Sequence, residues 1–230
     1  MLVVAGFLLA GIGDAREEET PLLVAAEVDR IAPGALWPGF DPASVPLAIY
    51  DGKRTYLFRH PAPPAEFQPL ASRPEVRRMA GRHPLVRANT FVALGGVPTA
   101  TLTIEPGESR SARELASIAV HEAFHVFQAA RYPSWGGNEV DLFTYPVDDS
   151  SQLQLVRLET EALRRGLSAK RDAQARCWLG AAIEIRQRRF AALGETGAAY
   201  ERGTELKEGL ARLVEGHPDR VVDVARGDLV

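Results

Sequence analysis

The stretch ARELASIAVHEAFHVFQAAR, residues 112–131, decides how the fold of this 230-residue chain is interpreted. Its apolar residues recur every three or four positions, which is the period of a helix with one buried face. Ser109 or Ser111 is the expected N-cap, and Glu114 follows Ser111 by three residues, which is the pattern of a capping box. Pro133 follows the stretch and cannot continue a helix. We therefore predict a helix over residues 111–132.

His121, Glu122 and His125 form an H-E-x-x-H motif inside this predicted helix. Residues four apart share a helix face, so the imidazoles of His121 and His125 can bind one metal ion, while Glu122 can reach a water molecule beside it. Apart from the motif itself, residues 116–130 are uncharged, which is typical of a buried helix. Two buried histidines without a partner would be costly, so the motif predicts a metal site and favours zinc.

A catalytic zinc site normally has three protein ligands and one open position, so a third ligand must come from elsewhere. The single cysteine, Cys177, lies in an Ala/Leu-rich stretch that is typical of a helix core, which leaves histidines and carboxylates. Gln128 and Arg131 stand where the longer metzincin motif has glycine and histidine, so that arrangement is excluded. A glutamate on a later helix remains.

The motif HEAFH, residues 121–125, and the later segment LKEGLARLVE, residues 206–215, together resemble the gluzincin clan of zinc metallopeptidases. The later segment is similar to the asparagine-glutamate-glycine-phenylalanine-alanine helix of the clan's zinc aminopeptidases, in which the glutamate is the third zinc ligand. The resemblance implies that Glu208 completes the site with His121 and His125. It also implies a zincin-like fold, in which a small β-lobe contributes an edge strand to the cleft and a helical lobe carries the ligands.

The residues alone leave other third ligands open. Glu201 and Glu205 share a face with Glu208 on the predicted last helix, and Glu159 and Glu161 lie on the helix after the motif, as in thermolysin-like gluzincins. If Glu208 is the ligand, we expect the helix over 196–215 to pack against the helix over 111–132 through Leu206, Leu210 and Leu213. The candidates for stabilising an oxyanion are Tyr132, Tyr145, Tyr200 and His217.

The composition changes near residue 108 and predicts an α+β chain with a β-rich lobe over 19–108 and a helical metal-binding lobe over 109–230. In the first lobe we expect a helix over 21–31 that starts at Pro21, and two hairpins, 45–50 with 55–58 and 89–94 with 99–104. A proline-rich loop is expected over 61–84. Further helices are expected over 153–167, 178–190 and 196–215.

Residues 1–18 begin with an apolar run over residues 1–12, which is too short to span a bilayer and is followed by the acidic run Glu17–Glu19. We interpret them as a signal peptide or an N-terminal apolar segment, which predicts export to the periplasm or outside the cell in the first case and a cytoplasmic protein in the second. No integral membrane segment is expected in the mature chain. Because 27 Lys and Arg residues nearly balance 30 Asp and Glu residues, no nucleic-acid partner is expected.

The sequence thus predicts a zinc metallopeptidase that hydrolyses peptide bonds in a peptide or protein substrate, with Glu122 taking a proton from the attacking water. The alternative is a non-catalytic binding module on a zincin-like scaffold, or a protein with a structural metal site. This alternative is considered because the sequence shows no motif that would anchor the amino terminus of a substrate. Specificity, exo- or endopeptidase action and oligomeric state stay open.

Overall fold

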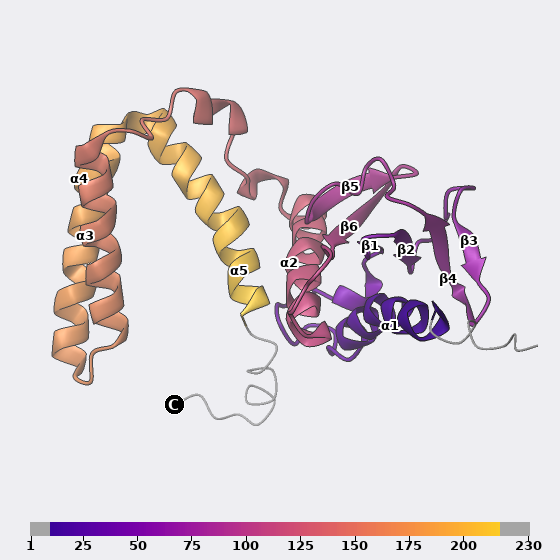
Figure 1. Cartoon of the computed structure of the whole chain (residues 1–230). Helices are drawn as coiled ribbons and strands as arrows, with labels where there is room; N and C mark the ends of the chain where they lie inside the picture. Colours follow the sequence, from indigo (N-terminus) through magenta and orange to yellow (C-terminus); the bar gives the residue numbers. More distant parts are fainter. Residues whose placement is uncertain (1–9, 217–230) are drawn as a thin grey trace, which may run out of the picture. The chain divides into compact units, whose positions relative to one another are not determined.

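A computed structural model describes residues 10–216 of the chain, with side chains from residue 20 onward (Figure 1). It divides into two compact units, residues 1–133 with 208–230 and residues 134–207. Each unit is described by itself below. Within residues 10–216, no helix combines the length and the hydrophobicity that a membrane crossing requires.

The first unit contains a six-stranded mixed sheet in the order β3-β4-β2-β1-β6-β5, in which only the β1–β6 pair is parallel. Both expected hairpins are confirmed, because β1 pairs with β2 and β5 pairs with β6 in antiparallel register. In the first hairpin, the Asp51 carboxylate accepts hydrogen bonds from the backbone N–H groups of Lys53 and Arg54 at 2.8 and 2.6 Å, which closes the turn. The strands are β1 (Leu47–Tyr50), β2 (Arg54–Phe58), β3 (Gln68–Leu70), β4 (Arg73–Ala80), β5 (Thr90–Leu94) and β6 (Val97–Thr103).

The loop expected over 61–84 is wrong, since β3 and β4 lie within it. In β4 only Val76 is buried, and its other residues are exposed or half-buried. The strand therefore lacks the apolar alternation that reveals strands in a sequence. It forms because its backbone pairs with β2 on one side and β3 on the other.

Two helices, α1 (Ala10–Asp29) and α2 (Ala112–Arg131), join the sheet in one hydrophobic core. Phe124 of α2 is fully buried there, with its ring edge-on to Phe40 and Trp37 at centroid distances of 5.1 and 5.7 Å. The helix expected to start at Pro21 is longer, and Pro21 lies inside α1 instead of opening it. The local sequence at Pro21 resembles a helix start, but the helix begins at Ala10, and its part after Pro21 packs in the core through Val24 and Val28.

The second unit contains a helical hairpin of α3 (Ser150–Leu167) and α4 (Asp172–Thr204), preceded by the short helices η2 (Pro133–Trp135, whose first residue belongs to the first unit) and η3 (Glu139–Phe143). Gly194 interrupts α4 with a φ of 72°, a conformation that glycine adopts without strain, so the expected break between two helices is present as a kink. Cys177 is exposed, which corrects its expected place in a helix core. After α4 the chain continues through the π-helical turn η4 (Glu205–Gly209) to α5 (Leu210–Glu215).

The architecture is mixed α+β, with the sheet in the N-terminal part and helices after it, as predicted. The unit boundaries do not follow the expected division at residue 108. The reason is that α2 buries Leu115, Ala119 and Phe124 against the core that includes the sheet, so the H-E-x-x-H helix belongs to the same unit as the strands. The first unit also contains the short helix η1 (Pro42–Ser44). The N-terminal apolar segment falls mostly outside the described residues, and only its continuation from residue 10 is seen, as the start of α1.

Candidate metal centre

The helix α2 holds the H-E-x-x-H motif on a backbone that is fixed at its start and along one face. Ser111 is the N-cap: its hydroxyl accepts a hydrogen bond from the Glu114 N–H at 3.3 Å, and the Glu114 carboxylate accepts one from the Ser111 N–H at 2.7 Å. This is the predicted capping box. The two reciprocal bonds satisfy N–H groups that a helix start otherwise leaves without partners. The motif therefore lies on a well-anchored helix.

Three ligand atoms converge beside α2. The Nε2 atoms of His121 and His125 are 3.0 Å apart, and the Oε2 atom of Glu208 lies 3.6 Å from the first and 3.3 Å from the second. Glu208 is part of η4 and belongs to the same compact unit as both histidines. The Glu208 side chain is 49% exposed, so the group opens to solvent on the glutamate side.

The remaining ring nitrogens of the two histidines face oxygen atoms. His121 Nδ1 lies 2.9 Å from Oε2 of Glu215, and His125 Nδ1 lies 2.9 Å from Oε1 of Gln128. Both partner atoms can accept a hydrogen bond, so an imidazole that carries its proton on Nδ1 donates it there and presents the Nε2 lone pair to the group. Two lone pairs and a carboxylate oxygen then face one another, an arrangement that a cation at the centre would stabilise.

The spacing of these atoms fits a small tetrahedral ion. Ligand bonds of about 2.0–2.1 Å at tetrahedral angles separate the ligand atoms by about 3.3 Å, and the three observed separations are 3.0, 3.3 and 3.6 Å. Among the residues whose side chains the structure describes, these three are the group of His, Cys, Asp and Glu close enough to hold an ion. The arrangement is a candidate metal site with three protein ligands.

Glu122 lies next to this group in α2 and is buried, with 8% of its surface exposed. It shares with His121 an open hollow of about 460 Å³ between α2 and α5. Side chains of both charge signs line the hollow beside them, namely Arg110, Glu114, Arg212 and Glu215, together with Ser117 and Ile118. A carboxylate adjacent to a candidate ligand histidine, at the edge of a solvent-accessible hollow, can exchange a proton with a bound molecule.

Two of the alternative third ligands, Glu159 and Glu201, belong to a buried ion-pair network within the second unit. Arg189, with only 4% of its side chain exposed, donates to Glu159 at 2.9 Å and also pairs with Glu201. Arg186 donates to the other oxygen of Glu159 at 2.6 Å. These carboxylates compensate buried or partly buried guanidinium groups, which explains their position without a metal.

The other two alternatives also pair with arginines of the second unit. Glu161 accepts hydrogen bonds from Arg164 at 2.8 Å and Arg165 at 2.7 Å, and these bonds, first that of Arg164, lower the pKa of Glu161 to about 2. Glu205 accepts from Arg186 at 2.9 Å. Of the five glutamates considered, Glu208 is the one that the structure brings together with His121 and His125.

Three of the candidates for oxyanion stabilisation have contacts elsewhere. The hydroxyl of Tyr145 donates to Glu201, and burial followed by this hydrogen bond raises the pKa of Tyr145 to about 12. The ring of Tyr200 contacts that of Tyr145 at a centroid distance of 5.6 Å. Tyr132 caps the end of α2, and its ring packs edge-on against Phe127 at 5.8 Å. The fourth candidate, His217, lies outside the described residues.

The buried face of α5 differs from the expected one. Ala211 and Val214 are buried in the core, Leu210 packs partly against it, and Leu213 is 47% exposed. Leu206 lies before α5, in η4, and is 42% exposed. The π-helical turn adds one residue to a turn of helix, so the residues after it are rotated relative to the regular period used for the prediction.

Glu215 and Gln128 are the residues that the sequence did not identify as part of the site. Gln128 lies three positions after His125 on the same helix, a spacing that places two side chains side by side. The spacing alone would have allowed a contact between Gln128 and His125 to be predicted. Glu215 is the last residue of α5, far from His121 in the sequence. Its contact with His121 depends on how α5 packs against α2, so local spacing does not predict it.

Comparisons of the chain with protein-family models, with curated proteins and with solved structures find no match. The function is therefore inferred from the arrangement of the chain's own side chains.

Proposed function

We propose that this chain is a zinc-dependent peptide hydrolase with a zincin-like fold of the gluzincin type, in which His121, His125 and Glu208 bind the zinc ion. The observation that carries the proposal is the triangle of two imidazole nitrogens and one carboxylate oxygen, with sides of 3.0, 3.3 and 3.6 Å. Imidazole and carboxylate ligands suit zinc, and three of them leave a fourth position for water or substrate, which is the pattern of catalytic zinc sites.

When bound, zinc lowers the pKa of water and polarises a carbonyl group, which are the two requirements for hydrolysing an amide. Glu122 accepts the proton of the attacking water on its carboxylate and delivers it to the nitrogen of the leaving amine. Its burial, at 8% exposed, keeps this carboxylate in a medium where charge interactions are stronger than in water. The same residue thus serves first as a base and then as an acid.

Glu215 and Gln128 position the two histidines. By accepting the Nδ1 protons at 2.9 Å, they hold each ring in one tautomer and one orientation, with Nε2 directed toward Glu208. The negative charge of Glu215 also makes the His121 ring a better electron donor. These contacts support a site that is organised before the ion binds.

The edge of the sheet offers a binding surface for an extended peptide. β5 is an edge strand, and it lies against α2 in the same unit. One side of its backbone is not paired with another strand of the sheet, so a substrate can add to it through main-chain hydrogen bonds. This supports an endopeptidase or a peptidase for extended segments.

The proposal is tested with metal analysis and a single isosteric substitution. Purified protein should contain about one zinc ion per chain, and chelation should lower its melting temperature. Glu122→Gln should retain zinc and lose peptide hydrolysis, measured by mass spectrometry on a peptide library, because the amide cannot accept the proton. Glu184→Gln, at an exposed glutamate of α4, is the matched control and should hydrolyse peptides normally.

Two outcomes would contradict the proposal in different ways. Protein without zinc, whose stability does not respond to added zinc, would exclude a zinc site. Zinc-loaded protein that cleaves no peptide in the library would favour the alternative, a non-catalytic binding module on the same scaffold.

A further inference from the structure

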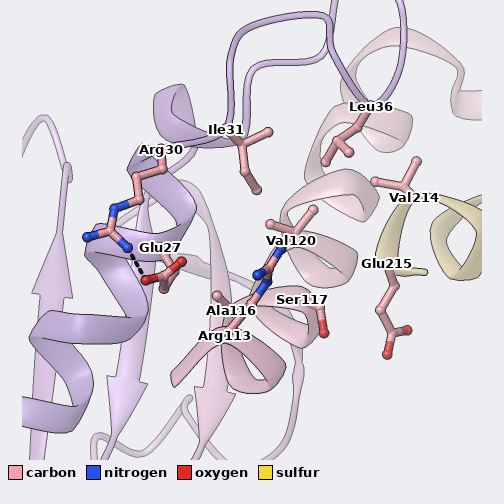
Figure 2. A pocket seen from close by; sticks show the side chains of 10 residues that line it. All are labelled: Glu27, Arg30, Ile31, Leu36, Arg113, Ala116, Ser117, Val120, Val214 and Glu215. Carbon is pink, nitrogen blue, oxygen red and sulfur yellow. Dashed lines mark hydrogen bonds and ion pairs between the residues drawn. The ribbon is translucent and has the colours of Figure 1, made fainter. Parts of the chain in front are cut away.

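A second hollow lies beside the candidate metal centre, within the same unit. It has a volume of about 350 Å³, within the range of sites that bind small ligands, and is formed by α1, α2, the segment after α1 and the end of α5. Figure 2 shows Ile31 and Leu36 from that segment, Val120 from α2 and Val214 from α5 around it. The walls are mostly apolar, so the hollow favours a ligand that loses apolar surface to it.

Four charged side chains line this hollow, those of Glu27, Arg30, Arg113 and Glu215, and each of them has an interaction partner. Glu27 forms an ion pair with Arg30, drawn as a dashed line in Figure 2. Glu215 accepts from His121 at 2.9 Å and from Arg212 at 2.5 Å. A charged ligand would have to compete with these contacts and give up its own hydration, whereas an uncharged apolar group has neither cost.

The hollow adjoins the open hollow that contains His121 and Glu122. Ser117 and Glu215 line both of them. A peptide whose scissile carbonyl lies at Glu122 is therefore bound next to the apolar hollow, close enough for one of its side chains to enter beside Ser117. The residue that enters is close in the peptide to the bond that is cut.

We propose that the hollow lined by Ile31, Leu36, Val120 and Val214 binds a large uncharged side chain of the substrate, such as leucine or phenylalanine, and thereby selects which peptides are cleaved. This inference rests on the proposed peptide hydrolysis. Burial of such a side chain, compared with alanine at the same position, corresponds to about a tenfold to hundredfold gain in kcat/KM.

The inference is tested with a larger side chain in the segment after α1, which reduces the volume of the hollow. Leu36 is half-buried at its wall, and Leu36→Trp fills part of the space without changing α2 or α5. Leu85→Trp, at a 45% exposed leucine that does not line the hollow, is the matched control. Each protein is given pairs of peptides that wild type cleaves, identical except for phenylalanine or alanine at each position near the cut.

Wild type and Leu85→Trp should prefer phenylalanine over alanine at one position by about tenfold or more, and Leu36→Trp should lose most of that preference. A wild type without such a preference, or a Leu36→Trp variant that keeps it, would overturn the inference and leave the proposed hydrolysis intact. Absence of any cleavage by zinc-loaded wild type would instead refute the hydrolysis itself, and with it a selective role of the hollow in substrate cleavage.

A binding measurement gives a second readout that does not depend on turnover. In the zinc-loaded Glu122→Gln protein, N-acetyl-phenylalanine amide should shift the methyl NMR signals of Val120 and Val214 and leave that of Ile183, on α4, unchanged. The same probe should shift them less in the Leu36→Trp, Glu122→Gln double variant. Methyl signals of Val120 and Val214 that do not respond to the probe would also overturn the inference.

Discussion

Removing the carboxylate of Glu215 tests whether the histidines are organised for a metal. In Glu215→Ala, the Nδ1 proton of His121 loses the acceptor that lies 2.9 Å away, and the ring loses the contact that fixes its orientation. The loss of such a supporting contact typically costs 10- to 100-fold in metal affinity, which corresponds to about 1.4–2.8 kcal/mol of binding free energy. At saturating zinc, the stabilisation by the metal falls by the same amount.

The corresponding change in melting temperature follows from the size of the unit that contains the site, residues 1–133 and 208–230. For a unit of about 150 residues, each 1 kcal/mol shifts the melting temperature by about 2–4 °C, so the zinc-induced rise should shrink by about 3–11 °C. The measurement is thermal unfolding with and without zinc, together with a competition titration for the zinc Kd. Glu215→Ala can also lower the melting temperature of the apoprotein. Comparing the zinc-induced rise of each protein with its own apoprotein corrects for that change.

Arg212→Ala is the matched control. It removes the other partner of Glu215, which donates at 2.5 Å, and leaves the contact with His121. Its zinc-induced rise should stay within about 1 °C of wild type, because an exposed ion pair contributes little. If Glu215→Ala binds zinc within twofold of wild type, Glu215 does not organise His121 for a metal.

Three further outcomes are expected. Glu208→Ala should weaken zinc binding far more than Glu184→Ala in the same competition titration, because it removes a ligand whose oxygen lies 3.3 Å from His125 Nε2; equal affinities would assign the third ligand elsewhere. Arg189→Met should destabilise the second unit by about 3–5 kcal/mol in urea unfolding, since it leaves the buried carboxylate of Glu159 and the partly buried carboxylate of Glu201 without this cation. A change below about 1 kcal/mol would contradict that account. Tyr145 should titrate near pH 12 in a tyrosine absorbance titration, because burial and then the hydrogen bond to Glu201 raise its pKa. The stability that this raised pKa contributes is present below pH 10 and lost between pH 10 and 12, and ionisation near pH 10 would show that Tyr145 is neither buried nor bonded to Glu201 in solution.

The features that the sequence predicted correctly are those that depend on neighbours along the chain. The helix with the H-E-x-x-H motif begins at its capping box and ends before Pro133, as its local pattern requires. The hairpin around Asp51 forms because a carboxylate two and three residues from the backbone N–H groups of Lys53 and Arg54 closes the turn. The break expected between the helices over 178–190 and 196–215 is present as a kink at Gly194, a residue that can adopt a positive φ.

Features that depend on distant segments were open or mistaken. β4 was missed because a strand with one buried residue is held by backbone pairing to β2 and β3, which leaves little trace in the pattern of apolar residues. The start of α1 was placed at Pro21 because the local residues resemble an N-terminus, whereas the helix begins at Ala10 and contains Pro21 in its interior.

For the candidate site, the sequence by itself determined His121, Glu122 and His125, since their spacing on one helix brings them together whatever the rest of the chain does. Only the tertiary structure decided among the glutamates. Glu159, Glu161, Glu201 and Glu205 pair with arginines, while the π-helical turn η4 and the packing of α5 on α2 bring Glu208 to the histidines and Glu215 to the Nδ1 atom of His121. The physical reason is that a contact between residues so far apart in the chain depends on how whole helices and strands pack. That packing is determined by the combined interactions of many side chains, which the spacing of a few residues in the sequence does not specify.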